Sequence, residues 1–186
     1  MPTLRSVSPE FPQNSANGDD FRTAMSQLAA GVCVITVGRG EERTGLTLTS
    51  ILTLSIDPPR LLLCIDKTAE AWPILNREGC FGVNLLCARH ELVGDRFVDR
   101  GGIRGAERYA EAKWLRLHTG VRLLADALAA IDCEIEETID RRFHSIVIGR
   151  VRAVVAPERT SSLVRWRGRY EQLGWSDLQA SLAVGL

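Results

Sequence analysis

The sequence predicts a mainly β fold, a β-barrel with a few helices covering its ends. About six or seven short segments combine β-branched and apolar residues in the way that strands do. Only two or three stretches place apolar residues at helical spacing. The two kinds of segment do not alternate regularly, which argues against a doubly wound parallel sheet.

Size and composition fit one packed domain without a strongly charged surface. The chain has 186 residues, of which 45% are hydrophobic, enough for a single core. It carries 23 Lys and Arg against 23 Asp and Glu, so its formal net charge is zero. Nucleic acid and acidic lipid need clustered positive charge, and a membrane span needs about 18–20 apolar residues in a row. We therefore expect neither a nucleic-acid partner nor a membrane partner.

The cysteines indicate a reducing compartment. The five cysteines form no CxxC motif and cannot all pair, so they predict neither a zinc site nor a disulfide framework. Each is flanked by apolar residues, as in Val32-Cys33-Val34, which suits buried thiols. The polar, proline-containing start of the chain holds no signal-peptide core. These features predict a cytoplasmic protein.

The expected elements follow in chain order within one domain at 19–174, between a flexible arm at 1–18 and a tail at 175–186. A first helix should lie between an N-cap at Asp19 or Asp20 and a stop at Gly31. The expected buried strands are 32–37, 60–65, 80–86, 131–139 and 145–155, the last two as an antiparallel ribbon. Two further helices are expected over 68–78 and 89–98, and a last short strand or loop over 166–173.

No familiar catalytic motif is present. No GxGxxG opens a helix, no Walker lysine follows a glycine loop, and there is no GxSxG nucleophile elbow. His90-Glu91 lacks the second histidine of a zinc protease, and only His118 and His144 remain elsewhere. The sequence therefore predicts no metal site and no catalytic side chain.

The most informative segment is rich in hydroxyl groups, from Gly45 to Ser55. It has strand composition, yet it carries more hydroxyls than a plain core strand tolerates, because each buried hydroxyl needs a partner. One interpretation is an exposed edge strand whose threonines reflect β propensity. The other is a ligand edge, where small side chains let a flat ring rest on the strand while main-chain groups bond its polar rim.

Seven short motifs resemble, in order and spacing, those of one known family. They are Phe21-Arg-Thr-Ala-Met25, Gly31-Val-Cys-Val-Ile-Thr36, Gly45-Leu-Thr47, Ser55-Ile-Asp-Pro-Pro59, Phe81-Gly-Val-Asn84, Ile131-Asp-Cys-Glu134 and His144-Ser-Ile-Val-Ile-Gly149. In these motifs the chain resembles the flavin reductase-like, FMN-binding split-barrel proteins. The resemblance implies a six-stranded antiparallel Greek-key split barrel that forms a homodimer.

The resemblance also implies where ligands bind. The residues expected beside the flavin ring are Thr47, Leu48, Thr49, Ser50, Ile51, Thr53 and Leu54. The residues expected at the flavin phosphate or ribityl chain are Lys67, Thr68 and Ala69. Those expected near the nicotinamide are Arg142, His144 and Tyr170. This chain departs from relatives in carrying Arg142-Phe143 where they have Gly-Asp before the histidine, and Leu48-Thr49-Ser50 where they have Ala-Asn-Ser or Ala-Asn-Ala.

The implied activity is an NAD(P)H:flavin oxidoreductase. NADH or NADPH would give a hydride directly to N5 of FMN, which is favoured over FAD, and the protein would supply orientation and electrostatics. Reduced flavin would then diffuse to a partner monooxygenase. Three alternatives stay open. The first is electron transfer to another acceptor such as a corrin cobalt, and the second is flavin binding without catalysis. The third is a nucleic-acid-binding barrel that uses Trp166 and Tyr170 among Arg165, Arg167 and Arg169.

Overall fold

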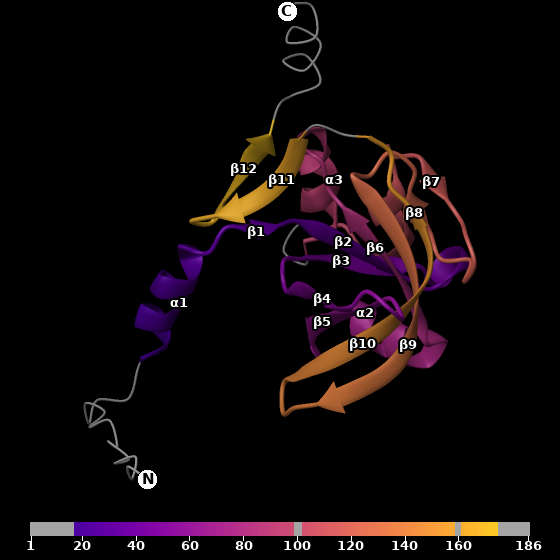
Figure 1. The fold of residues 1–186 in the computed structure, drawn as a ribbon, viewed down its shortest axis with the longest axis horizontal. Coiled ribbons are helices and arrows are strands. Elements are labelled where there is room, and N and C mark those ends of the chain that lie inside the picture. The colour runs from indigo at the N-terminus through magenta and orange to yellow at the C-terminus, as the bar shows by residue number, and fades with distance from the viewer. Residues whose placement is uncertain (1–16, 99–101, 159–160, 175–186) are drawn as a thin grey trace, which may run out of the picture.

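The core of the molecule is a curled antiparallel sheet of seven strands (Figure 1). The computed structural model describes residues 17–98, 102–158 and 161–174. The strands of this sheet run in the order β3-β2-β6-β9-β10-β5-β4. Their bounds are β2 Cys33–Val37, β3 Thr44–Leu48, β4 Ile51–Ser55, β5 Arg60–Asp66, β6 Cys80–Leu85, β9 Ala129–Asp140 and β10 His144–Val155.

Two smaller sheets and several helices surround this sheet. A three-stranded sheet has the order β1-β11-β12, and β7 pairs with β8. These strands are β1 Ala30–Gly31, β7 Trp114–Leu115, β8 Leu123–Leu124, β11 Ser161–Trp166 and β12 Arg169–Gly174. The helices are α1 Gly18–Ser26, α2 Ala71–Glu78 and α3 Glu91–Arg96, with 3-10 turns η1 Gly40–Glu42, η2 Ala88–His90 and η3 Gly105–Tyr109. Figure 1 shows α1 projecting away from the main body.

Two hydrophobic cores explain the uninterrupted apolar run of β2. Cys33, Ile35 and Val37 point into the core enclosed by the curled sheet. Val32, just before the strand, and Val34 point to the other side, into a second core around Phe97. Because both faces of β2 are covered, its sequence is apolar at successive positions instead of alternating.

The fold confirms the prediction of a mainly β protein and corrects several details. The main sheet has seven strands, where the resemblance implied six. The N-cap of α1 is Asn17, whose side chain accepts hydrogen bonds from the backbone of Asp19 and Asp20; those two residues form the first helical turn instead of capping it. The ordered helix thus begins inside the segment expected as a flexible arm. The rest of that arm, 1–16, and the tail at 175–186 lie outside the described residues.

Two segments differ from the expected elements. The stretch 166–173 belongs to a β-hairpin, because Arg167 and Gly168 both adopt positive φ and turn the chain between β11 and β12. The hydroxyl-rich stretch expected as one strand forms two, β3 and β4. None of the helices in the described ranges has the length and apolar character needed to cross a bilayer.

Candidate functional site

The hydroxyl-rich segment joins the two edges of the main sheet. β3 is one edge strand and β4 the other, and only Thr49 and Ser50 separate them in sequence. Thr49 and Ser50 are exposed, while Leu48 and Ile51 on either side pack against the core within the sheet. Figure 1 shows this link on the side of the sheet that faces α1. The link is therefore a short, exposed backbone segment held at both ends by partly buried side chains.

Thr47 attaches the link to α3. Its backbone N–H donates to the carbonyl of Phe97 at 3.0 Å, and its hydroxyl donates to the carbonyl of Gly94 at 2.6 Å. Both polar groups of Thr47 are thus satisfied within the protein. Its role in this geometry is to fix the strand against α3, and the exposed backbone available to a ligand begins at Thr49.

On its other side the link is attached to β5. The hydroxyl of Ser50 donates to the carbonyl of Cys64 at 3.0 Å, and the N–H of Cys64 returns a bond to the carbonyl of Ser50 at 3.1 Å. Cys64 pairs in turn with Ile146 on β10. Side chains alternate across a strand, so Cys64 and Ile146 share the outer face of the sheet, away from the buried neighbours of each. The half-buried side chains of Cys64 and Ile146 therefore form an apolar surface on the outer face of the sheet, next to the link.

The expected phosphate-binding residues are engaged by carboxylates. Lys67 Nζ lies 2.8 Å from Asp140 Oδ1 at the end of β9. The N–H and the hydroxyl of Thr68 both donate to Asp66 Oδ1 at 2.8 Å, a local Asx turn. This turn delays the helix, so α2 begins at Ala71 instead of at Thr68.

The two carboxylates beside Lys67 are held in their charged form. The N–H and hydroxyl of Thr68, with the nearby His144, lower the pKa of the Asp66 carboxyl. Hydrogen bonds from Lys67 and Ser145, together with the charge of Lys67, lower the pKa of the Asp140 carboxyl. Both carboxylates stay ionised at neutral pH, and an anionic ligand must compete with them for Lys67.

The structure brings His144 and Arg142 beside Lys67. His144 is the first residue of β10 and pairs with Asp66 of β5, and the N–H of Lys67 donates to the carbonyl of Phe143 at 2.9 Å. Arg142 is exposed and its guanidinium lies 4.7 Å from the centre of the Phe143 ring. Residues expected at the flavin phosphate and at the nicotinamide thus gather at one end of β5 and β10. This end of the strands, at His144, is two residues from Ile146 along β10, a distance of about 7 Å.

The remaining expected residues lie elsewhere. Thr53 and Leu54 are exposed on β4, and Ala69 is buried in the core within the sheet. Tyr170 belongs to β12 of the three-stranded sheet and packs beside Gly94 of α3. Partial burial raises the pKa of its hydroxyl, and the nearby Asp95 adds to this. Within one chain Tyr170 is therefore associated with α3, whereas His144 is on the main sheet beside β5.

Sequence reasoning missed the groups that hold these residues in place. The carbonyls of Gly94 and Phe97 that receive the bonds of Thr47 carry no sequence signal. Asp66 was detectable, because an Asp two residues before a Thr is typical of an Asx turn at a helix start. Asp140 was not, since its contact with Lys67 depends on the pairing of distant strands.

The comparisons with known proteins identify the family of this chain. Residues 25–174 match the family described as the flavin reductase like domain. The chain belongs to this family. The match confirms the resemblance found in the sequence and the oxidoreductase class that it implied.

Two curated relatives carry the same description. FMN reductase (NADH) RutF of Bradyrhizobium diazoefficiens is 35% identical over 158 residues, which cover 85% of this chain and 87% of that protein. FMN reductase (NADH) RutF 2 of Methylorubrum extorquens is 37% identical over 165 residues, which cover 89% of this chain and 92% of that protein.

Two solved structures share the fold. BorF, the flavin reductase component of a bacterial two-component tryptophan halogenase, has a TM-score of 0.78 and 31% identity, covering 86% of this chain and 99% of BorF. The styrene monooxygenase flavin reductase of Pseudomonas putida S12 has a TM-score of 0.73 and 26% identity, covering 84% of this chain and 98% of that chain.

Proposed function

We propose that this flavin reductase family member reduces FMN with NADH and releases the reduced flavin to a separate oxygenase. The observation that carries the proposal is the position of the Thr49-Ser50 link. It is an exposed backbone segment with an apolar sheet face on one side and, beyond that face, the strand end that carries Lys67. The relatives named FMN reductase (NADH) support the choice of FMN and NADH.

The described residues fit FMN in two respects. A flat aromatic ring suits the half-buried apolar side chains of Cys64 and Ile146 and the exposed link beside them. A phosphate suits the end of β5, where Lys67 supplies an ammonium group. The distance of about 7 Å between these two positions along the strand is compatible with a ribityl chain.

The protein's part in the reaction is binding and orientation. FMN and NADH, when bound, supply the two rings between which a hydride passes. Backbone N–H groups at Thr49 and Ser50 would bond the polar edge of the flavin ring, and the anchors Leu48 and Ile51 would keep that backbone fixed. Lys67 would exchange Asp140 for the flavin phosphate, while Arg142 and His144 would orient the nicotinamide dinucleotide. No side chain has to act as nucleophile or general base.

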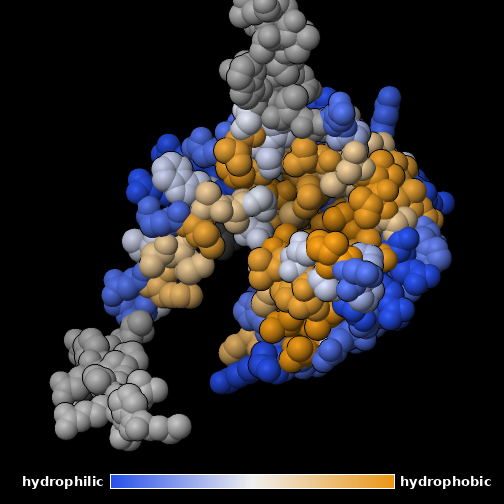
Figure 2. All heavy atoms as spheres, in the orientation of Figure 1, coloured by the Kyte–Doolittle hydropathy of each residue, from blue (hydrophilic) through white to orange (hydrophobic). Residues whose placement is uncertain are grey.

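A second copy of the chain would complete the site as a homodimer. α1 buries none of its residues; its Phe21 is 64% exposed, and Leu28 just after the helix is 61% exposed. On β4, Leu52 is 64% exposed, and Ile56 just after it 81%. Figure 2 shows apolar surface on α1 and on the main body, with a hollow between them that the β3–β4 link faces. Covering both surfaces with a partner would bury an apolar area that one chain leaves in water.

Release of reduced flavin to an oxygenase is supported by the structural relatives. BorF is described as a component of a two-component halogenase, and the Pseudomonas protein as the reductase of styrene monooxygenase. An open site on an exposed link would let the flavin leave by diffusion. Five cysteines, most of them buried, suit a cytoplasmic setting, which we retain as part of the proposal.

The test is turnover by the purified full chain with NADH and FMN, followed by the loss of NADH absorbance. We expect turnover with FMN, slower turnover with FAD, and a preference for NADH over NADPH. Flavin binding without NADH loss would instead show a binding protein. The dimer is tested by light scattering on Leu52→Asp, which should dissociate it. The matched control is Leu92→Asp on α3, where the leucine is 76% exposed; this variant should remain dimeric.

A further inference from the structure

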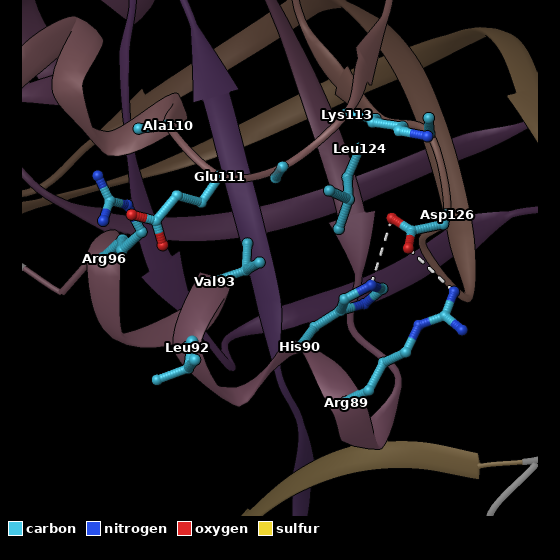
Figure 3. A pocket seen from close by; sticks show the side chains of 12 residues that line it. Arg89, His90, Leu92, Val93, Arg96, Ala110, Glu111, Lys113, Leu124 and Asp126 are labelled. Atoms are coloured by element: carbon cyan, nitrogen blue, oxygen red, sulfur yellow. Dashed lines mark hydrogen bonds and ion pairs between the residues drawn. The ribbon is translucent and has the colours of Figure 1, made fainter.

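A second cluster of reactive side chains lies at the start of α3, apart from the β3–β4 link. Cys87 precedes η2, His90 ends it, and Asp126 lies in the loop before β9. Cys87 Sγ is 3.2 Å from His90 Nδ1, and His90 Nε2 is 3.3 Å from Asp126 Oδ1. Figure 3 shows the imidazole directed at the Asp126 carboxylate. A thiol, an imidazole and a carboxylate in this order are the arrangement that activates a cysteine.

The carboxylate is held in its charged form. Partial burial raises the pKa of Asp126, but the hydrogen bond and charge of His90 and the charge of Arg89 outweigh it, so the pKa lies below its usual range. Arg89 bonds the second oxygen, at 2.9 Å from Asp126 Oδ2 (Figure 3). A carboxylate at Nε2 stabilises the imidazolium that forms when His90 takes the thiol proton through Nδ1.

The other buried cysteines provide internal references. Burial raises the pKa of Cys33 and of Cys133 to about 12, and for Cys133 the charge of Asp132 adds to this. Burial also raises the pKa of Cys80, although the Arg39 guanidinium lies 3.4 Å from its sulfur. Among the five cysteines, all of them in described parts of the chain, the contact with an imidazole belongs to Cys87.

A cavity gives small molecules access to this cluster. It has a volume of about 530 Å³, and its walls include His90, Asp126, Arg96 and Lys113 (Figure 3). Cys87 lies behind the imidazole and is 4% exposed. A cavity of this size admits hydrogen peroxide, and also small thiol reagents, as far as His90.

We propose that Cys87 is a peroxide-reactive thiol, activated by His90 and Asp126, whose oxidation slows the reductase. His90 removes the thiol proton, and the thiolate attacks one oxygen of hydrogen peroxide. The S–O bond forms as the O–O bond breaks, and the leaving hydroxide takes the proton from His90. Sulfur is oxidised by two electrons to a sulfenic acid, and the peroxide is reduced to that acid's oxygen and one water. Two external thiols reverse the change, yielding a disulfide and water.

The source of the peroxide rests on the proposed function, because reduced flavin and O₂ give oxidised flavin and hydrogen peroxide. The effect on activity follows from α3. Cys87 and His90 form a reciprocal cap at the turn that leads into α3, and the carbonyls of Gly94 and Phe97 near its end receive the bonds of Thr47. An added oxygen on Cys87 displaces His90 and disturbs this turn. The disturbance passes through α3 to Thr47 and so to the strand that leads into the β3–β4 link.

The first experiment uses the wild-type full chain with no flavin present. Hydrogen peroxide is added together with a sulfenic-acid trap, and labelling of each cysteine is measured by peptide mass spectrometry. We expect Cys87 to be labelled at least about tenfold faster than Cys33 and Cys133. Equal labelling of these three cysteines overturns the proposal, whether or not the protein reduces flavin.

The second experiment compares His90→Gln and Asp126→Asn with Lys113→Gln, a change in the same cavity that leaves the cluster intact. His90→Gln should slow the labelling of Cys87 about tenfold and make its alkylation rise with pH like that of an ordinary thiol. In Asp126→Asn the labelling rate of Cys87 should lie between those of the wild type and of His90→Gln. An unchanged labelling rate of Cys87 in both variants would contradict the role of His90.

The third experiment measures NADH-dependent FMN reduction after peroxide treatment. The wild type should lose activity as Cys87 is labelled and regain it with dithiothreitol, while Cys87→Ser should keep its activity under the same treatment. Labelled Cys87 with full activity contradicts the link to Thr47. A protein that never oxidises NADH, yet labels at Cys87, refutes the proposed function and leaves the thiol chemistry standing.

Discussion

Changing the two members of the Lys67–Asp140 ion pair should move FMN affinity in opposite directions. Lys67 Nζ lies 2.8 Å from Asp140 Oδ1, so the carboxylate competes with a phosphate for the ammonium group. Lys67→Gln removes the cation. Asp140→Asn removes the competitor and still offers an oxygen to the hydroxyl of Ser145, which donates to Asp140 in the native chain. The local fold is therefore retained while the ammonium charge is released.

The size of each change follows from the exposure of the pair. The Lys67 side chain is 27% exposed and that of Asp140 66%, so solvent screens the interaction strongly. A contact of this kind is worth a factor of about two to five in binding. We expect Lys67→Gln to raise the FMN dissociation constant about two- to fivefold, and Asp140→Asn to lower it by a similar factor. Riboflavin has no phosphate, so its dissociation constant should stay unchanged in both variants.

The assay is titration of FMN and of riboflavin with protein, followed by quenching of flavin fluorescence. Raising the salt concentration to about 1 M should reduce the differences for FMN, because exposed charges are then screened over a few ångströms. Lys113→Gln, the other lysine of the chain, is the matched control and should leave both flavins unaffected. Equal changes for FMN and riboflavin, or the same sign in both variants, would refute the phosphate role of Lys67.

Three further predictions concern the framework of the site. Thr47→Val removes the hydrogen bond to Gly94 and should lower the melting temperature by about 2–4 °C, whereas Thr47→Ser should not; calorimetry decides, and equal melting points would contradict the anchoring role. Gly82→Ala should destabilise the fold by about 1–3 kcal/mol in urea unfolding, because an added Cβ would lie 2.4 Å from a threonine oxygen. Gly31→Ala, where an added Cβ meets nothing within 4 Å, should be tolerated. Similar losses of stability in the two variants would be evidence against this packing. Since the folded-state pKa of Asp140 is lowered, its stabilising contribution is present above the unfolded pKa and is lost as pH falls below about 4; Asp140→Asn should show a shallower acid loss of stability, and an unchanged acid profile would speak against the pair.

The buried strands were predictable from sequence because burial leaves a local signal. The strands expected at 32–37, 60–65 and 80–86 correspond to β2, β5 and β6, which carry continuous or alternating apolar residues. The long ribbon of β9 and β10 was recognised for the same reason, with both strands one or two residues longer at their ends. These strands account for the mainly β class of the fold.

The arrangement of the candidate site could be predicted only partly from the sequence. The reason is that it depends on contacts between distant segments. The hydroxyl-rich segment stood out in the sequence, and the structure bears out its interpretation as edge strands, since β3 and β4 are the two edges of the main sheet; its interpretation as a ligand edge stays a prediction. The segment is divided at Thr49 and Ser50 because its two halves are the two edge strands, β3 and β4, of one curled sheet. No local sequence pattern encodes this arrangement. The grouping of Lys67 with His144 follows from the register of β5 with β10, and register is a property of the assembled sheet.

The most direct test of the account is a crystal structure of the full chain grown with excess FMN. The flavin ring should lie against the backbone of Thr49 and Ser50, with its phosphate reaching toward Lys67 and the tip of the β9–β10 hairpin. A ring bound in the cavity beside α3 instead, or a link region filled by protein side chains while FMN binds elsewhere, would contradict it.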